Sequence, residues 1–323
     1  MVIKGRSHVD INKIILYNIP VTKFATGIIV LRMRKMKIID IIKGEKPSLS
    51  FEVFPPKTSD KFDTVQLATE EIAVLNPSFM SVTYGAGGGT SEFTLSIAKN
   101  IQEKYNVPAI AHLTCVNSTR AEVKARLEML KNSGIENILA LRGDITPENQ
   151  NREKWDYHFA NELVEEIKNG YDFCVGGACY PECHPESSHQ KEDILNLKRK
   201  VNAGCEFLTT QMFFDNNVLY NYLYKIREAG ITVPIVAGIM PVTNAKQIKR
   251  SCELSNCTLP QRFKTIVDRY GDNPEAMKQA GIAYATEQII DLFANGINAV
   301  HVYSMNKPDI AEKIQSNLSE IIK

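Results

Sequence analysis

The sequence lacks a charge surplus of either sign and lacks any long hydrophobic run. Its 323 residues contain 38 Lys and Arg against 37 Asp and Glu, a formal net charge of +1. Nucleic-acid-binding domains are usually strongly basic, and a membrane-spanning helix needs about 18 or more apolar residues in succession. We therefore predict no nucleic-acid partner and no membrane partner. Because 44% of the residues are hydrophobic, a chain that is disordered over most of its length is also excluded.

Cysteine pairs of the CxxC type are absent too. The seven cysteines are odd in number and irregularly spaced, which excludes a disulfide framework and favours a reducing, cytoplasmic setting. The segment Cys179-Tyr-Pro-Glu-Cys183-His184 offers possible metal ligands. Buried or incidental thiols are the more economical interpretation, so we predict no metal site.

Two common nucleotide-binding motifs are missing. No GK[ST] follows a glycine-rich loop, which excludes a phosphate-binding P-loop. The loop Gly85-Ala-Gly-Gly-Gly-Thr90 has threonine where a dinucleotide fingerprint has its third glycine, and the next strand candidate does not end in an acid. We interpret this loop as one that allows close backbone approach to a ligand.

From residue 48 onward, short β-rich runs alternate with longer amphipathic segments. Alternation of this kind predicts parallel strands joined by helices. Eight candidates in one chain predict a single-domain α/β protein, a (β/α)8 TIM barrel over residues 36–323, with a doubly wound open sheet as the alternative. The expected strands are Leu49–Phe54, Phe79–Thr83, Ile110–Thr114, Ile138–Leu141, Phe173–Tyr180, Phe207–Gln211, Ile235–Ile239 and Ala299–Tyr303.

The helices show start and stop signals. Residues 118–132 carry apolar side chains at helical spacing, open on Ser118 and Thr119 with Glu122 nearby, and are followed by Gly134. The same design recurs at 189–203, 216–229 and 243–255. Residues 270–295 predict an extra helical stretch before the last strand.

Polar residues gather where the predicted strands end, which is where barrel enzymes carry their active sites. Glu52 is the most informative, because it lies inside an apolar strand between Phe51 and Val53. A buried carboxyl without a partner has a raised pKa and can act as a general acid near neutral pH. A solvent-facing or salt-bridged glutamate is the alternative.

Two further patterns suggest a phosphate-bearing ligand. Arg142-Gly143-Asp144 ends the fourth strand, and arginine can bind phosphate through two parallel hydrogen bonds. A simple turn with a local ion pair is equally consistent. Asp193, Asn196 and Lys200 share one face of a predicted helix after a rim loop, either as a solvated face or as a surface for a cofactor tail.

Long motifs in these segments resemble the methylenetetrahydrofolate reductase family, bacterial type. The resemblance covers about residues 37–323 and rests on Ser50-Phe-Glu-Val-Phe-Pro-Pro-Lys57, Ser81-Val-Thr-Tyr-Gly-Ala86, Ala111-His-Leu-Thr-Cys115, Leu139-Ala-Leu-Arg-Gly-Asp144, Ala178-Cys-Tyr-Pro-Glu-Cys-His-Pro-Glu186, Leu195-Asn-Leu-Lys-Arg-Lys-Val201 and Thr210-Gln-Met-Phe-Phe-Asp215. It implies a barrel with non-covalent FAD, reduced by NADH or NADPH, that reduces 5,10-methylenetetrahydrofolate to 5-methyltetrahydrofolate in a ping-pong scheme. It also implies a role in one-carbon metabolism and methionine biosynthesis.

The same resemblance implies roles for individual residues. Glu52 is similar to the general acid that opens the methylene bridge, and Asp144 to the acid that steadies the resulting cation. Substrate contacts are implied for Glu52, Asp144, Gln211, Gln247 and Lys307, where close relatives carry arginine at the last position. Thr83 resembles a position near the nicotinamide. FAD contacts are implied for Tyr84, Ala86, His112, Arg142, Gly143, Asp144, Ala160, Tyr180, His184, Asp193, Asn196, Arg199 and Lys200.

Three alternatives remain at this stage. A barrel methyltransferase that uses folate or thiolate-bound zinc would need a fuller ligand set than Cys183 and His184. A non-catalytic binding subunit is disfavoured by Glu52, Asp144 and Gln211. A reductase subunit of an electron-transfer complex would add a redox partner, and we also expect a homo-oligomer.

Residues 1–35 match nothing in the family. They hold seven basic residues and one acid, so residues 36–323 carry a net charge of −5. Pro20 and scattered charges interrupt any apolar core, which disfavours a signal peptide. We expect a disordered N-terminal extension or a mis-assigned start, with Met33 or Met36 as the true first residue.

Overall fold

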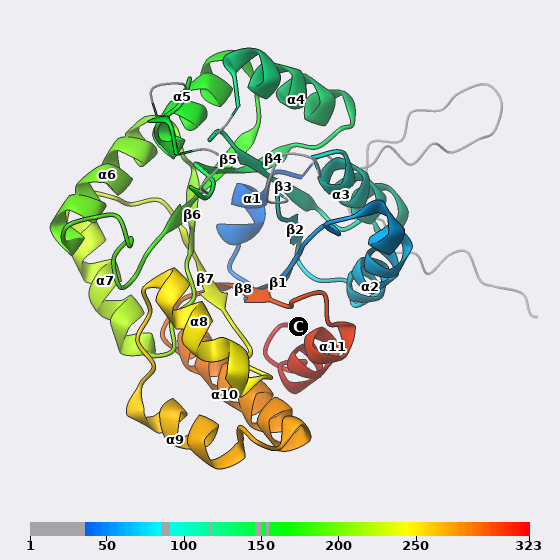
Figure 1. Ribbon diagram of the computed structural model, residues 1–323, viewed down its shortest axis with the longest axis vertical. Coiled ribbons are helices and arrows are strands. Elements are labelled where there is room, and N and C mark those ends of the chain that lie inside the picture. The colour runs from blue at the N-terminus through cyan, green and yellow to red at the C-terminus, as the bar shows by residue number, and fades with distance from the viewer. Residues whose placement is uncertain (1–35, 85–90, 117, 146–149, 153–154) are drawn as a thin grey trace, which may run out of the picture. The chain divides into compact units, whose positions relative to one another are not determined.

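Eight parallel strands form a closed barrel in the order β1 to β8 (Figure 1). The computed structural model describes residues 36–84, 91–116, 118–145, 150–152 and 155–323, without the side chains of residues 91, 247, 249, 250 and 254. The predicted (β/α)8 barrel is therefore confirmed, and the open sheet is excluded by the pairing of β1 with β8. The strands are β1 Ser48–Val53, β2 Met80–Val82, β3 Ala109–Thr114, β4 Asn137–Leu141, β5 Cys174–Cys179, β6 Phe207–Thr210, β7 Ile235–Ile239 and β8 Ala299–Tyr303.

Helices surround the barrel in the described residues. They are α1 Ile38–Ile42, the short 3-10 helix η2 Ser59–Lys61, α2 Phe62–Val74, α3 Ser91–Tyr105, α4 Arg120–Asn132, α5 Ala160–Gly170, α6 Gln190–Asn202, α7 Asn216–Glu228, α8 Ala245–Ser255, α9 Gln261–Tyr270, α10 Pro274–Ala294 and α11 Pro308–Asn317. Among the residues that the structure describes, no helix combines the length and apolar composition needed to cross a bilayer.

Because successive side chains of a strand point to opposite faces, the apolar residues of the barrel form two separate clusters. On β1, Leu49, Phe51 and Val53 join the large core between barrel and helices. A smaller cluster at the amino ends of the strands includes Phe79 and Phe207 and receives Ile38, Ile39 and Ile42 of α1. Helix α1, which the sequence reading did not single out, therefore closes this end of the barrel and lies centrally in Figure 1.

The start and stop signals predicted for residues 118–132 are present. Of the two hydroxyl residues at its start, Thr119 caps α4, and it forms a reciprocal capping box with Glu122. Gly134, which follows α4, has φ +73°, a conformation that glycine adopts without strain.

Three helices, α8 to α10, lie between β7 and β8, in the place of the predicted extra helical stretch. Most of residues 270–295 forms α10, which contacts α7 and α11 and so occupies the ring position between them. The helices added between β7 and β8 are therefore α8 and α9. The sequence of residues 270–295 could not show this, because the place of a helix in the ring depends on its contacts with distant segments.

Candidate functional site

Glu52 lies on β1, where it is in register with Ser81 of β2 and Tyr303 of β8. Its side chain keeps 22% of its surface accessible. Burial nevertheless raises its pKa to about 8, in the direction that the sequence predicted. The carboxyl group is therefore mostly protonated at neutral pH.

The backbone around Glu52 is held on both sides. Ser304 Oγ donates to the carbonyl oxygen of Glu52 at 2.6 Å. The side-chain amide of Asn306 accepts from Phe54 N at 2.9 Å and donates to Phe54 O at 2.8 Å. Thr83 N donates to Val53 O at 2.9 Å, which joins β2 to the end of β1. These roles of Ser304 and Asn306 depend on the closure of the barrel, which brings the end of β8 beside β1.

His112 faces Glu52 from β3. Its Nε2 atom lies 3.7 Å from Glu52 Oε2 and is buried, with no hydrogen-bond partner among the residues that the structure describes. Burial lowers the pKa of His112 to about 3, so the imidazole is neutral at physiological pH. The pair is thus a neutral acid beside a neutral base rather than an ion pair.

A second buried histidine, His301 on β8, went unnoticed in the sequence. Its Nδ1 lies 2.7 Å from Ser50 Oγ and its Nε2 lies 2.7 Å from Ser81 Oγ. Burial lowers its pKa to about 3. Period-two spacing placed Ser50 and Glu52 on one face of their strand, but the histidine partner lies about 250 residues away.

Arg142 at the end of β4 pairs with Glu186 in the loop after β5. Its NH1 and NH2 atoms lie 2.9 and 2.5 Å from the two carboxylate oxygens. This fork geometry raises the pKa of Arg142 and lowers that of Glu186. Arg142 is therefore paired with Glu186, whose carboxylate fixes the orientation of the guanidinium.

The loop after β5 is locally strained. Cys183 has φ +97°, and His184 N, which follows it, donates to Asp193 Oδ2 of α6 at 3.1 Å. The Tyr180 and His184 rings meet edge to face with centroids 4.6 Å apart. Burial lowers the pKa of His184 and raises that of Asp193. These contacts bring Tyr180, His184 and Asp193 together.

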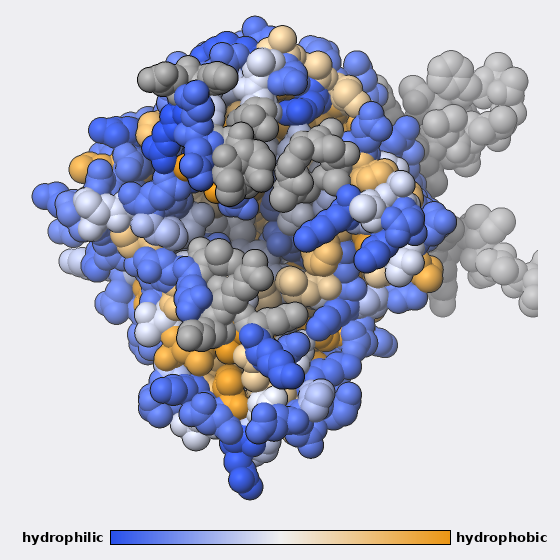
Figure 2. All heavy atoms as spheres, viewed as in Figure 1, coloured by the Kyte–Doolittle hydropathy of each residue, from blue (hydrophilic) through white to orange (hydrophobic). Residues whose placement is uncertain are grey.

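Helix α6 presents the remaining predicted polar face. Lys200 Nζ donates to Ala178 O at 2.5 Å, and its stem fits against Gly177, where a Cβ would meet Lys200 Cδ at 2.9 Å. Asn196 and Arg199 are exposed and hydrogen-bonded to each other at 2.8 Å. Figure 2 shows hydrophilic residues over most of the periphery of the barrel in this view.

The other predicted residues are spread around the rim. Gly143 has φ +95°, and an added Cβ would lie 2.6 Å from Val116, so the backbone itself requires glycine there. Asp144 and Lys307 are exposed, and Lys307 Nζ contacts Thr243 Oγ1 at 3.0 Å. Gln211 Oε1 accepts from Met212 N at 2.8 Å.

Three predicted positions carry less structural information. Ala160 is half-buried at the first position of α5. Gln247 belongs to α8, but its side chain is outside the described part of the structure. Ala86 and the rest of the glycine-rich loop at 85–90 also lie outside the described residues.

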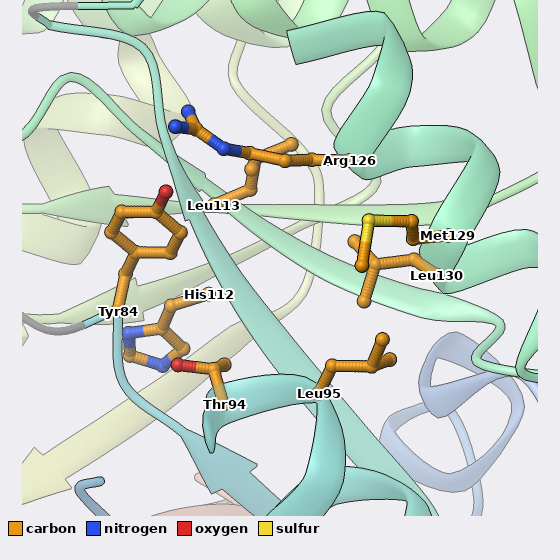
Figure 3. A pocket seen from close by; sticks show the side chains of 8 residues that line it. All are labelled: Tyr84, Thr94, Leu95, His112, Leu113, Arg126, Met129 and Leu130. Carbon is orange, nitrogen blue, oxygen red and sulfur yellow. The ribbon is translucent and has the colours of Figure 1, made fainter. Parts of the chain in front are cut away.

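A cavity of about 30 Å³ adjoins His112 (Figure 3). Tyr84 lines it at the end of β2, and the Arg126 guanidinium lies 5.6 Å from the Tyr84 ring centroid. The volume suits about one water molecule and is too small for a folate or a flavin. Within the described residues, no group of three or more His, Cys, Asp or Glu side chains could hold a metal ion.

The chain is similar to one known family over most of its length. A family model described as methylenetetrahydrofolate reductase matches residues 37–319. The 5,10-methylenetetrahydrofolate reductase of Escherichia coli is 36% identical over 267 residues, which are 83% of this chain and 89% of that protein. The methylenetetrahydrofolate reductase (NADH) 1 of Zea mays is 35% identical over 299 residues, 88% of this chain and 50% of that protein.

A solved structure shares the fold at lower identity. It is an uncharacterised protein from Clostridium thermocellum that binds two copies of 5-methyl-5,6,7,8-tetrahydrofolic acid. The TM-score is 0.60 at 15% identity, over 87% of this chain and 97% of that chain.

Proposed function

Because the chain belongs to the methylenetetrahydrofolate reductase family, we propose that it reduces 5,10-methylenetetrahydrofolate to 5-methyltetrahydrofolate with electrons from NADH or NADPH, through non-covalent FAD. The proposal rests on one observation: the side chain of Glu52, near the carboxyl end of a barrel strand, has a pKa raised to about 8. Its backbone is fixed by Ser304, and Asn306 fixes that of the neighbouring Phe54.

Protonated Glu52 can supply the proton that opens the methylene bridge of the substrate. The departing nitrogen needs that proton, and a carboxyl group with a pKa near the working pH both holds it and releases it. Asp144, with its carboxylate exposed at the rim, is suited to face the cation that remains on the substrate. Gln211, Gln247 and Lys307 complete the proposed substrate contacts, and Thr83 lies on the proposed nicotinamide side.

The outer rim fits FAD by the chemistry of its donors. The Arg142 guanidinium has the fork geometry that binds a pyrophosphate, which would take the place of the Glu186 carboxylate, and Lys200 adds a second cation on α6. His184 and Asn196 add polar groups for the ribityl and adenosine hydroxyls. When bound, FAD supplies a hydride carrier that links the nicotinamide and the folate. The proposed contacts are the thirteen residues from Tyr84 to Lys200 given by the family resemblance.

Anaerobic half-reactions test the proposal. Purified protein saturated with FAD should oxidise NADH or NADPH with menadione, and the reduced protein should convert methylenetetrahydrofolate. Protein that cannot be reconstituted with FAD would refute the proposal. Comparing the two donors also decides the nicotinamide preference.

The Glu52→Gln variant tests the assigned role. We expect loss of folate reduction with retention of flavin reduction by the nicotinamide, because only the opening of the methylene bridge needs the proton of Glu52. Glu45→Gln, the same change at an exposed position before β1, is the matched control. Equal loss of both half-reactions in Glu52→Gln would contradict the role.

The remaining proposals concern the oligomeric state, the cellular location and the metabolic role. We propose a cytoplasmic homo-oligomer that serves one-carbon metabolism and methionine biosynthesis. The alternative is that the chain works as a reductase subunit together with a redox partner. Co-purification of that partner from native extract tests this alternative.

A further inference from the structure

The two histidines inside the barrel have opposite hydrogen-bond status. Ser50 Oγ donates its only hydrogen to Val300 O at 2.9 Å, so it must accept from His301 Nδ1. His301 is neutral, and its Nε2 therefore accepts from Ser81 Oγ. Both ring nitrogens of His301 are satisfied, which makes this residue part of the scaffold.

His112 is not satisfied in this way. Its Nε2 is buried, lacks a hydrogen-bond partner among the described residues, and lies 3.7 Å from Glu52 Oε2. A buried polar atom without a partner costs about 1–3 kcal/mol, so it calls for an explanation. Glu52 Oε2, at 3.7 Å, offers one, because a small side-chain rotation would bring the two atoms to about 3 Å.

We propose that His112 is a positioning residue for Glu52, with its Nε2–H donating to Oε2 so that the proton on the other carboxyl oxygen points to the substrate. The inference rests on the proposed function, in which Glu52 is the general acid. As Glu52 loses its proton, the hydrogen bond from His112 becomes charge-assisted and strengthens. An interaction that strengthens along the reaction lowers the barrier.

The surrounding groups do not compete for this role. Among the residues that the structure describes, the titratable or charged side chains beside the pair include His301 and Tyr303 on β8. Tyr84 and Arg126 line the cavity next to His112, and the arginine stays protonated. His301 is neutral, and burial holds the pKa of Tyr303 well above its usual value, with its hydroxyl donating to Thr210 O. Neither changes charge near neutral pH, so a change in the titration of Glu52 reports on His112.

The test titrates Glu52 directly, through the infrared carbonyl stretch of its protonated carboxyl group, identified by its absence in Glu52→Gln. Removing the donor in His112→Met should move the midpoint upward by about one pH unit, because the ionised carboxylate loses its hydrogen bond. His112→Gln, whose amide nitrogen reaches the Nε2 position, should restore most of the shift. His158→Met, at an exposed histidine, is the control.

Kinetics give the second readout. In His112→Met, folate reduction per bound flavin should fall about 10- to 100-fold, and the high-pH limb of its rate profile should move upward with the infrared midpoint. An unchanged midpoint would overturn the proposal, and a downward shift would show that Nε2 accepts rather than donates. If His112→Met does not fold, His112→Asn, whose amide falls short of the Nε2 position, replaces it.

The titration needs neither folate nor nicotinamide. If the wild-type protein fails to reduce methylenetetrahydrofolate, the proposed function fails while the infrared result still decides the contact between His112 and Glu52. If the wild-type protein is active and the midpoint does not move, only the role of His112 fails.

Discussion

Replacing Glu52 with glutamine should stabilise the protein, and the gain should grow with pH. Burial raises the pKa of the folded carboxyl from 4.5 to about 8. Between these values the folded state retains a proton that the unfolded chain has released. Since the unfolded state then binds fewer protons, the free energy of unfolding of the wild-type protein falls as pH rises through this window.

The magnitude follows from the size of the shift. Each pH unit within the window changes the free energy of unfolding by about 1.4 kcal/mol, so about 3 kcal/mol is lost between pH 4.5 and about pH 7. The partial exposure of the side chain makes this an upper value. Glutamine cannot ionise, so Glu52→Gln escapes the loss.

Urea unfolding of both proteins at several pH values between about 5 and 8 measures the effect. His112 and His301 have folded pKa values of about 3, below the usual 6.5, so they add a stability that rises with pH up to about 6.5. That contribution is common to both proteins and cancels in their difference. A difference that stays constant with pH would refute the assignment of a protonated, buried Glu52.

Three further predictions concern the rim. Arg142→Lys should weaken FAD binding at least about tenfold, measured by flavin fluorescence, because an ammonium cannot form two parallel hydrogen bonds; unchanged affinity would remove Arg142 from the cofactor site. Gly143→Ala should lower the free energy of unfolding by about 2 kcal/mol or more, because φ is +95° and the new Cβ would lie 2.6 Å from Val116. Gly170→Ala, with no atom within 4 Å of its new Cβ, should be neutral or stabilising in the same urea assay. Asn306→Ala removes both hydrogen bonds to Phe54 and should slow folate reduction several-fold with FAD affinity unchanged; an unaltered rate would show that the backbone beside Glu52 needs no such restraint.

Local signals in the sequence were enough for the architecture. Alternating apolar runs and helical segments predicted the eight strands to within a residue or two, because each strand is a short apolar run buried on both faces and each helix buries one apolar face. The capping box of Thr119 and Glu122 and the positive φ of Gly134 are equally local. The place of α10 in the ring is not, since it depends on contacts with α7 and α11 far along the chain.

The candidate site also has some features that are visible in the sequence and others that depend on the fold. By itself, the sequence determined that a carboxyl group sits inside the apolar strand at Glu52 and that polar residues end most strands. Only the tertiary structure decided what those groups meet: His112 at 3.7 Å from Glu52, His301 bridging two serines, and Glu186 orienting Arg142. Barrel closure joins strands that are distant in the chain, and no local pattern encodes which side chains then share the interior. The electrostatic character of Glu52 therefore follows from the fold, although its presence in the strand is visible in the sequence.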